Sequence, residues 1–140
     1  MNGERLLLDA TFIVGYLNPR DQHHANAQKC MRRVEEAFEV LITEAVLVEI
    51  GNLLHQMQHR YRAAEFIDAC YVSPNITVIT VDTVLLKRAV EYYRLHADKA
   101  WGLTDCISFV VMRDQGLTIA VTADNDYQQA GFRALMLEPL

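Results

Sequence analysis

The sequence has few cysteines, prolines and glycines, and it has no long run of apolar residues. Three cysteines, widely separated and odd in number, exclude a disulfide framework and the spacing of a zinc site, so we expect reduced thiols. No apolar run approaches the ~20 residues of a membrane-spanning helix. The opening residues, MNGERLLLDA, lack the long apolar region and cleavage site of a signal peptide. We therefore expect a cytoplasmic protein with no membrane partner.

Positive charge is also scarce. The chain has 13 lysines and arginines against 18 aspartates and glutamates, a formal net charge of −5. This balance argues against a general nucleic-acid coat, because non-specific affinity for nucleic acid comes mainly from cationic side chains that neutralise phosphates. It does not exclude an enzyme that meets nucleic acid locally, since a site built of carboxylates would itself make the net charge negative.

Length and hydrophobicity indicate one core. A chain of 140 residues, 51% of them hydrophobic, has the usual size of one domain and can bury roughly two thirds of its unfolded surface. We therefore predict a single domain over residues 1–140.

Short apolar strands alternate with helices along the chain. The strands are expected at 6–8, 40–42, 77–81, 117–122 and 134–137. The helices are expected at 11–17, 23–38, 43–57, 63–71, 83–96 and 104–116, with a short one ending at residue 131. Strands that are apolar throughout and separated by helices predict an α/β fold with a mainly parallel sheet of four to five strands, covered on both faces.

Acidic residues occur where this fold binds ligands. Asp9 directly follows the first strand, Asp124 follows the strand at 117–122, and Asp105 opens the helix before that strand. Ligands of open parallel sheets bind beyond the carboxyl ends of the strands. Glu49 lies at the margin of the apolar stripe of its helix, from which its side chain can reach the same edge.

Each acid also has an ordinary structural interpretation. Asp9, Asp105 and Asp124 all stand near helix starts, where aspartate caps the helix, and singly we favour that role. As a set they are different, because two unit charges 4 Å apart repel by ~1 kcal/mol in water and by ~4 kcal/mol at an effective dielectric constant of 20. If these acids converge, a hard divalent cation is the natural partner, since Mg²⁺ and Mn²⁺ prefer oxygen ligands.

The ordered set of acids carries a resemblance to a known family. The segments are LLLDATFIVGYLNPRDQHHANA, TEAVLVEIGNLL and GLTDCISFVVMRDQGLTIAVTADNDYQQAGF, which together reach from residue 6 to residue 132. They resemble PIN-domain nucleases, and within them the small VapC-like toxin group. The resemblance implies a single PIN-like domain with three α/β/α layers, and it implies that the catalytic and metal-binding acids are Asp9, Glu49, Asp105 and Asp124.

The same resemblance implies supporting residues, an activity and partners. The residues that would orient the acids are Thr11, Thr104, Thr122 and Asp126, with Asp126 ranked below the four main acids as a ligand. The implied activity is an Mg²⁺- or Mn²⁺-dependent endoribonuclease that hydrolyses RNA with a metal-activated water. The implied context is the toxin half of a toxin–antitoxin pair, with RNA as substrate, an antitoxin protein as partner and a homodimer as the assembly.

Two other functions stay open at this stage. A catalytically silent binding or scaffold module of the same fold would carry the acids without using them. A phosphatase of the haloacid dehalogenase kind is suggested faintly by LLLDATF, but that family needs a second aspartate where this chain has Thr11.

Three other residues have competing interpretations. His55 and His59 have the i, i+4 spacing of a zinc pair, but the intervening segment has no glutamate, and we favour a solvated helix face. Trp101, before Thr104 and Asp105, is either a lid that stacks on bases or a packing anchor, and a lone tryptophan is more often an anchor.

Overall fold

The structure is a computed structural model that describes residues 3–139. Its strands are β1 (Arg5–Leu8), β2 (Glu39–Thr43), β3 (Ile76–Ile79), β4 (Ile119–Val121) and β5 (Arg133–Ala134). Its helices are α1 (Ala10–Leu17), α2 (His24–Glu36), α3 (Glu44–Leu53), α4 (Met57–Val72), α5 (Thr83–Leu95), α6 (Leu103–Gln115) and α7 (Asp126–Gln129). Among the described residues, no helix is long and apolar enough to cross a membrane.

The five strands form one sheet in the order β3-β2-β1-β4-β5, and each pair of neighbours is parallel. The predicted parallel sheet is therefore confirmed. The chain adds β2 and then β3 on one side of β1. It then returns through α5 and α6 and adds β4 on the other side of β1. This change of direction makes the carboxyl ends of β1 and β4 a topological switch point, where open α/β sheets form their ligand crevice.

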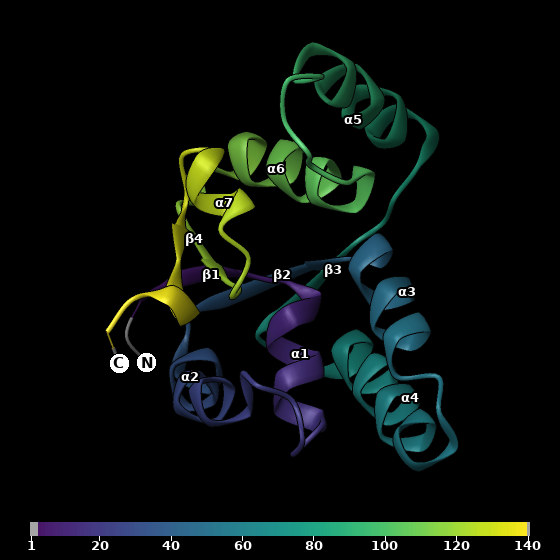
Figure 1. The fold of residues 1–140 in the computed structure, drawn as a ribbon, viewed down its shortest axis with the longest axis vertical. Coiled ribbons are helices and arrows are strands. Elements are labelled where there is room, and N and C mark those ends of the chain that lie inside the picture. The colour runs from purple at the N-terminus through teal and green to yellow at the C-terminus, as the bar shows by residue number, and fades with distance from the viewer. Residues whose placement is uncertain (1–2, 140) are drawn as a thin grey trace.

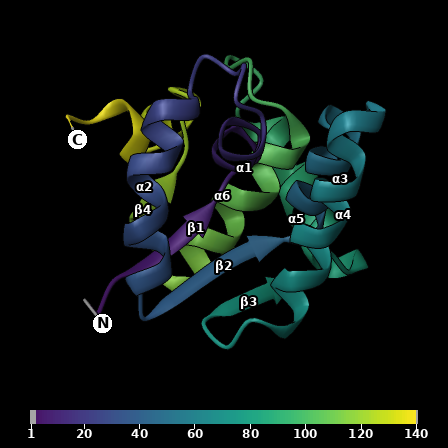
Figure 2. The same ribbon diagram turned by 90° about the horizontal axis from the view of Figure 1, so that it is seen from below.

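Helices cover both faces of the sheet, which confirms the predicted three layers (Figures 1 and 2). Successive strand residues point to opposite faces. In β1, Leu6 and Leu8 belong to the core cluster shared with α1–α4, whereas Leu7 belongs to the cluster shared with α5–α7. Leu6, Leu7 and Leu8 are thus all buried, on one face of the sheet or the other, which explains why they form an unbroken apolar run.

The long helix predicted for 43–57 is wrong. Thr43 does cap the helix, since its Oγ1 accepts a hydrogen bond from the Val46 N–H at 3.2 Å, but α3 ends at Leu53. Leu54 turns into the core, and the chain then reverses into α4, whose first residue, Met57, is 92% exposed. The apolar stripe read from the sequence therefore joined two helices that point in different directions.

This break also removes the i, i+4 histidine pair. His55 lies between α3 and α4, where its Nδ1 lies 2.8 Å from the Asn52 carbonyl oxygen, and His59 belongs to α4. The predicted last strand, 134–137, is also largely wrong, because only Arg133–Ala134 pairs with β4 and Leu135–Leu137 forms a 3-10 turn.

Candidate active site

Asp9 is the most buried acid of the site. It directly follows β1 and is 2% exposed. Its Oδ2 accepts hydrogen bonds from the hydroxyls of Thr122 at 2.7 Å and Thr11 at 2.9 Å, and its Oδ1 accepts one from the Tyr127 hydroxyl at 3.2 Å. Three hydroxyl donors on a buried carboxylate fix its orientation without supplying a positive charge, so the capping interpretation of Asp9 is not needed.

The two threonines also hold the loop after β4. Thr11 Oγ1 accepts from the Ala123 N–H at 3.0 Å, and Thr122 Oγ1 accepts from the Asp124 N–H at 3.0 Å. The two threonine oxygens also lie 3.2 Å apart. Each hydroxyl has a single proton, so when both hydroxyls donate to Asp9 there is no hydrogen bond between the two threonines. The start of α1 and the β4–α7 loop are therefore tied together through one carboxylate.

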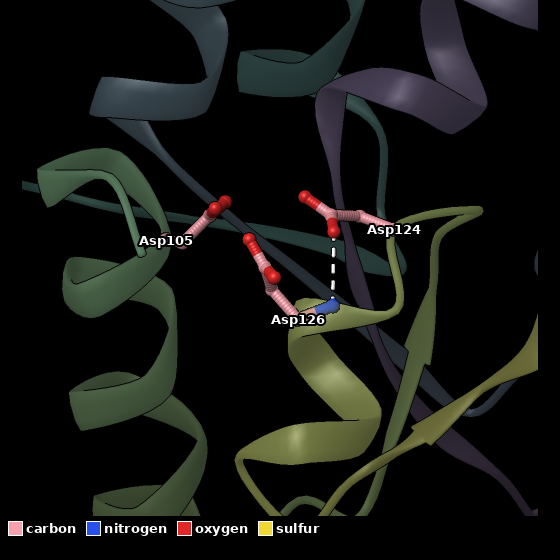
Figure 3. A group of neighbouring side chains, drawn as sticks. All are labelled: Asp105, Asp124 and Asp126. Atoms are coloured by element: carbon pink, nitrogen blue, oxygen red, sulfur yellow. Dashed lines mark hydrogen bonds between the residues drawn. The ribbon is translucent and has the colours of Figure 1, made fainter. Parts of the chain in front are cut away.

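Three further acids lie close together at this edge (Figure 3). Carboxylate oxygens of Asp105, Asp124 and Asp126 all lie within 4.8 Å of one another, and we call this group the aspartate triad. Asp105 comes from the first turn of α6, and Asp126 opens α7. Asp124 Oδ1 accepts the Asp126 N–H at 2.9 Å, so one of its oxygens shapes the loop. Within residues 3–139, no hydrogen bond or ion pair reaches the Asp105 carboxylate.

Two predicted residues remain, Glu49 and Thr104, and only Glu49 interacts with the acids of the site. Glu49, half-buried on α3, interacts electrostatically with Asp9 and Asp124. Thr104 lies next to Asp105 on α6, but its hydroxyl binds none of the described carboxylates.

The acids raise one another's pKa. Burial first, and then the charges of Asp9, Asp124, Glu49 and Asp126, raises the pKa of Asp105 to about 8. Burial followed by neighbouring carboxylates also raises the pKa of Glu49 and of Asp126. Within the described residues, no lysine or arginine forms an ion pair with any of them. Negative charge is therefore concentrated at this edge without a protein cation to balance it.

Burial also raises the pKa of Asp9, against the lowering effect of its hydrogen bonds from Thr122 and Thr11. Tyr127, completely buried, has a pKa well above its usual value, mainly because burial disfavours the phenolate. The tyrosine therefore remains a hydrogen-bond donor to Asp9 at any physiological pH.

The donor set suits a hard divalent cation. All candidate ligands are carboxylate oxygens, with no histidine or cysteine in the triad, which favours Mg²⁺ or Mn²⁺ over zinc. Two oxygens on opposite sides of one Mg²⁺ are about 4.2 Å apart, since each bond is about 2.1 Å long. Oxygens within 4.8 Å of one another can close on such an ion with small side-chain movements.

Comparison with known proteins identifies the family. The model of the PIN domain family matches residues 6–133. The chain belongs to the PIN domain family. A 127-residue alignment gives 28% identity to the 23S rRNA-specific endonuclease VapC20 of Mycobacterium tuberculosis, covering 91% of this chain and 95% of that protein.

Several solved structures share the fold. The crystal structure of M. tuberculosis VapC20, described as a sarcin-ricin loop cleaving toxin, superposes with a TM-score of 0.80 at 28% identity, covering 91% of this chain and 95% of that one. VapBC2 from Rickettsia felis, solved with a fragment of promoter DNA, gives a TM-score of 0.62 at 12% identity, covering 94% and 97%. DNA-bound VapBC from Salmonella typhimurium gives 0.60 at 14% identity, covering 93% and 96%. The last two similarities concern the fold alone.

Sequence reasoning missed one side chain of the site and ranked another differently from its place in the structure. Tyr127 is not among the residues that the sequence pattern predicts for the site, although its hydroxyl contacts Asp9; the only available signal is that it lies three residues after Asp124. Asp126 was ranked as a supporting residue, whereas the triad includes it and excludes Asp9 and Glu49. Both residues belong to the short helix α7, whose position depends on the loop that Thr11 and Thr122 hold.

Proposed function

We propose that the chain is one PIN domain that acts as a metal-dependent endoribonuclease, and that it is the toxin of a toxin–antitoxin pair. The observation that carries the proposal is the convergence of Asp9, Glu49 and the aspartate triad at the β1–β4 switch point without a protein cation. The similarity to VapC20, an RNA endonuclease, supports RNA as the substrate. The toxin description of that relative supports an antitoxin partner, and we further propose a homodimer in the cytoplasm.

The bound cation would be Mg²⁺ or Mn²⁺, held by Asp105, Asp124 and Asp126 with Asp9 as a further ligand. Such an ion neutralises charge on the phosphoryl oxygens and lowers the pKa of water, which hydrolysis of a phosphodiester requires. The protein's own contribution begins with Asp9, whose orientation is set by the hydroxyls of Thr11, Thr122 and Tyr127.

Proton transfer falls to Glu49 in this proposal. Its carboxylate is half-buried beside Asp9 and Asp124, and its raised pKa makes it a better base than a solvated glutamate. Glu49 would accept the proton of the attacking water, and a bound cation would favour the ionised form of Asp105.

The test is cleavage of RNA by the purified chain with Mg²⁺, Mn²⁺ or excess EDTA. Ribosomal RNA and a hairpin with the sarcin-ricin sequence are the first substrates, because VapC20 is described as acting on them. We expect cleavage with metal, none with EDTA, and none by Asp105→Asn. Asp68→Asn, the same substitution on the exposed face of α4, is the matched control and should cleave normally.

Two results would contradict the proposal. Metal binding without cleavage of any RNA would leave the silent scaffold module. Turnover of a small phosphate ester through a phospho-aspartate would favour the phosphatase, although Thr11 occupies the position where that family needs its second aspartate, and its hydroxyl is bonded to Asp9.

A further inference from the structure

A cavity lies outside the acidic site but shares the first turn of α6 with it. It has a volume of about 660 Å³ and lies between the end of α5, the α5–α6 loop and the first turn of α6. We call it the α5–α6 pocket. Gly102 and Cys106 line it, and Asp105 of the aspartate triad lies between them in sequence. The first turn of α6 therefore carries Asp105 and part of the pocket wall.

The chemistry of the lining is aromatic and cationic. Tyr93, His96 and Trp101 contribute rings, Arg94 and Lys99 contribute positive charge, and no carboxylate of residues 3–139 lines the pocket. The tryptophan is 6% exposed and is fixed by stacking on Tyr92 and by a 3.2 Å hydrogen bond from its Nε1 to Gln129. Tyr93, in contrast, is 49% exposed. A rigid floor with a free ring at the rim is suited to stacking a flat ligand.

Both cations have only weak competing partners. Arg94 pairs with Glu91 on the exposed side of α5, and Lys99 lies 3.8 Å from the Asp98 carboxylate. Exposed pairs of this kind contribute little stability, so a phosphate can displace either carboxylate. The two positive charges therefore line the same pocket as Cys106, the neighbour of Asp105 on α6.

We propose that the α5–α6 pocket binds a nucleobase of the RNA strand next to the cleaved bond, and that Arg94 and Lys99 bind its phosphate. The proposal rests on the proposed ribonuclease function and adds how the substrate is held. Proteins bind single-stranded nucleic acid by combining a cationic track with aromatic rings on which bases stack. The pocket offers both, and its wall includes Gly102 and Cys106, which flank Asp105 closely in sequence.

The chain carries its own probe, because Trp101 is its single tryptophan. The experiment titrates tryptophan emission of the full chain in EDTA, where no cleavage occurs, with oligoadenylate and separately with inorganic polyphosphate. We expect a saturable change in emission with oligoadenylate and a much weaker response to polyphosphate, which can bind the two cations but cannot stack on the rings. An equal response to both would overturn the proposal, since it would show binding of anions without bases.

Two pairs of variants test the two kinds of contact. Tyr93→Ala should weaken oligoadenylate binding about ten-fold through lost stacking, whereas Tyr61→Ala, an exposed tyrosine of α4, should not. The double variant Arg94→Ala/Lys99→Ala should reduce the slope of log Kd against log salt concentration by about 0.7, because the two side chains neutralise one phosphate. The control Arg32→Ala/Lys87→Ala removes the same amount of charge away from the pocket and should leave the slope unchanged. Arg32 lies on α2 and has an exposed ion pair with Glu36 like that of Arg94, and Lys87 lies two turns before Arg94 on α5.

RNA cleavage measured in parallel separates the two proposals. If the wild-type chain cleaves RNA and Tyr93→Ala cleaves it with the same KM and kcat, the pocket is wrong and the ribonuclease stands. If no metal supports cleavage while binding still depends on bases and on Tyr93, the ribonuclease is wrong and the pocket stands. A different result would be tryptophan emission that changes with protein concentration in the absence of RNA, together with a larger sedimentation coefficient. That result would show that a second copy of the chain covers the pocket, and it would overturn the proposal.

Discussion

Replacing Asp105 by asparagine should stabilise the metal-free protein at pH 8. The folded protein holds the pKa of this carboxyl at about 8, against 3.8 for the unfolded chain, because burial and four neighbouring carboxylates disfavour its charge. Between these two values the folded state binds more protons than the unfolded state. The free energy of unfolding therefore decreases as pH rises from about 4 and stops decreasing above about 8.

The magnitude follows from that interval. About four pH units at about 1.4 kcal/mol each set an upper limit of ~6 kcal/mol. Water reaches the partly exposed carboxylate and screens its neighbours, so we expect about 2–3 kcal/mol at pH 8 and no gain at pH 4. For a chain of this length that gain raises the melting temperature by roughly 6–9 °C. No hydrogen bond to Asp105 opposes it, since none reaches that carboxylate within residues 3–139.

The assay is thermal and urea unfolding of wild type, Asp105→Asn and the surface control Asp68→Asn, in EDTA and in Mg²⁺, from pH 4 to pH 9. Metal should stabilise the wild type at pH 8 far more than at pH 5, because the ion requires the ionised carboxylate. The variant should lose most of this response, and Asp68→Asn should follow the wild type. An Asp105→Asn protein that is less stable than wild type at pH 8, or has the same pH dependence, would refute the reasoning.

Three further variants test the contacts around the site. Thr122→Val should reduce the free energy of unfolding by about 3 kcal/mol in urea titrations, because Asp9 loses its shortest hydrogen bond and the Asp124 N–H loses its acceptor. Thr122→Ser should restore the stability. A Thr122→Val protein as stable as wild type would contradict this hydrogen-bond network. Tyr127→Phe should reduce the free energy of unfolding by about 1.5 kcal/mol and slow RNA cleavage. Unchanged stability would show that the 3.2 Å hydrogen bond to Asp9 does not stabilise the fold. Thr43→Ala should remove about 1 kcal/mol through the lost helix cap and leave kcat unchanged, so an activity loss at full folding would contradict a purely structural role.

Much of the architecture was predictable because its signals are local. Apolar runs such as Leu6–Leu8 indicate strands buried on both faces, and breakers such as the Ser73-Pro74-Asn75 segment separate α4 from β3. The helix break at Leu54 was not predictable in the same way. Its cause is the packing of that leucine into the core, and the apolar period runs through it without interruption.

The sequence by itself determined that acidic residues follow strands, and their order along the chain indicated the family. Only the tertiary structure decided which of them meet. Because β4 pairs with β1, the loop after β4 lies beside Asp9, and this pairing brings Asp124, Asp126 and Tyr127 to a residue more than a hundred positions earlier in the chain. Strand order is set by how whole helices cover the sheet, and no short segment of sequence contains that information.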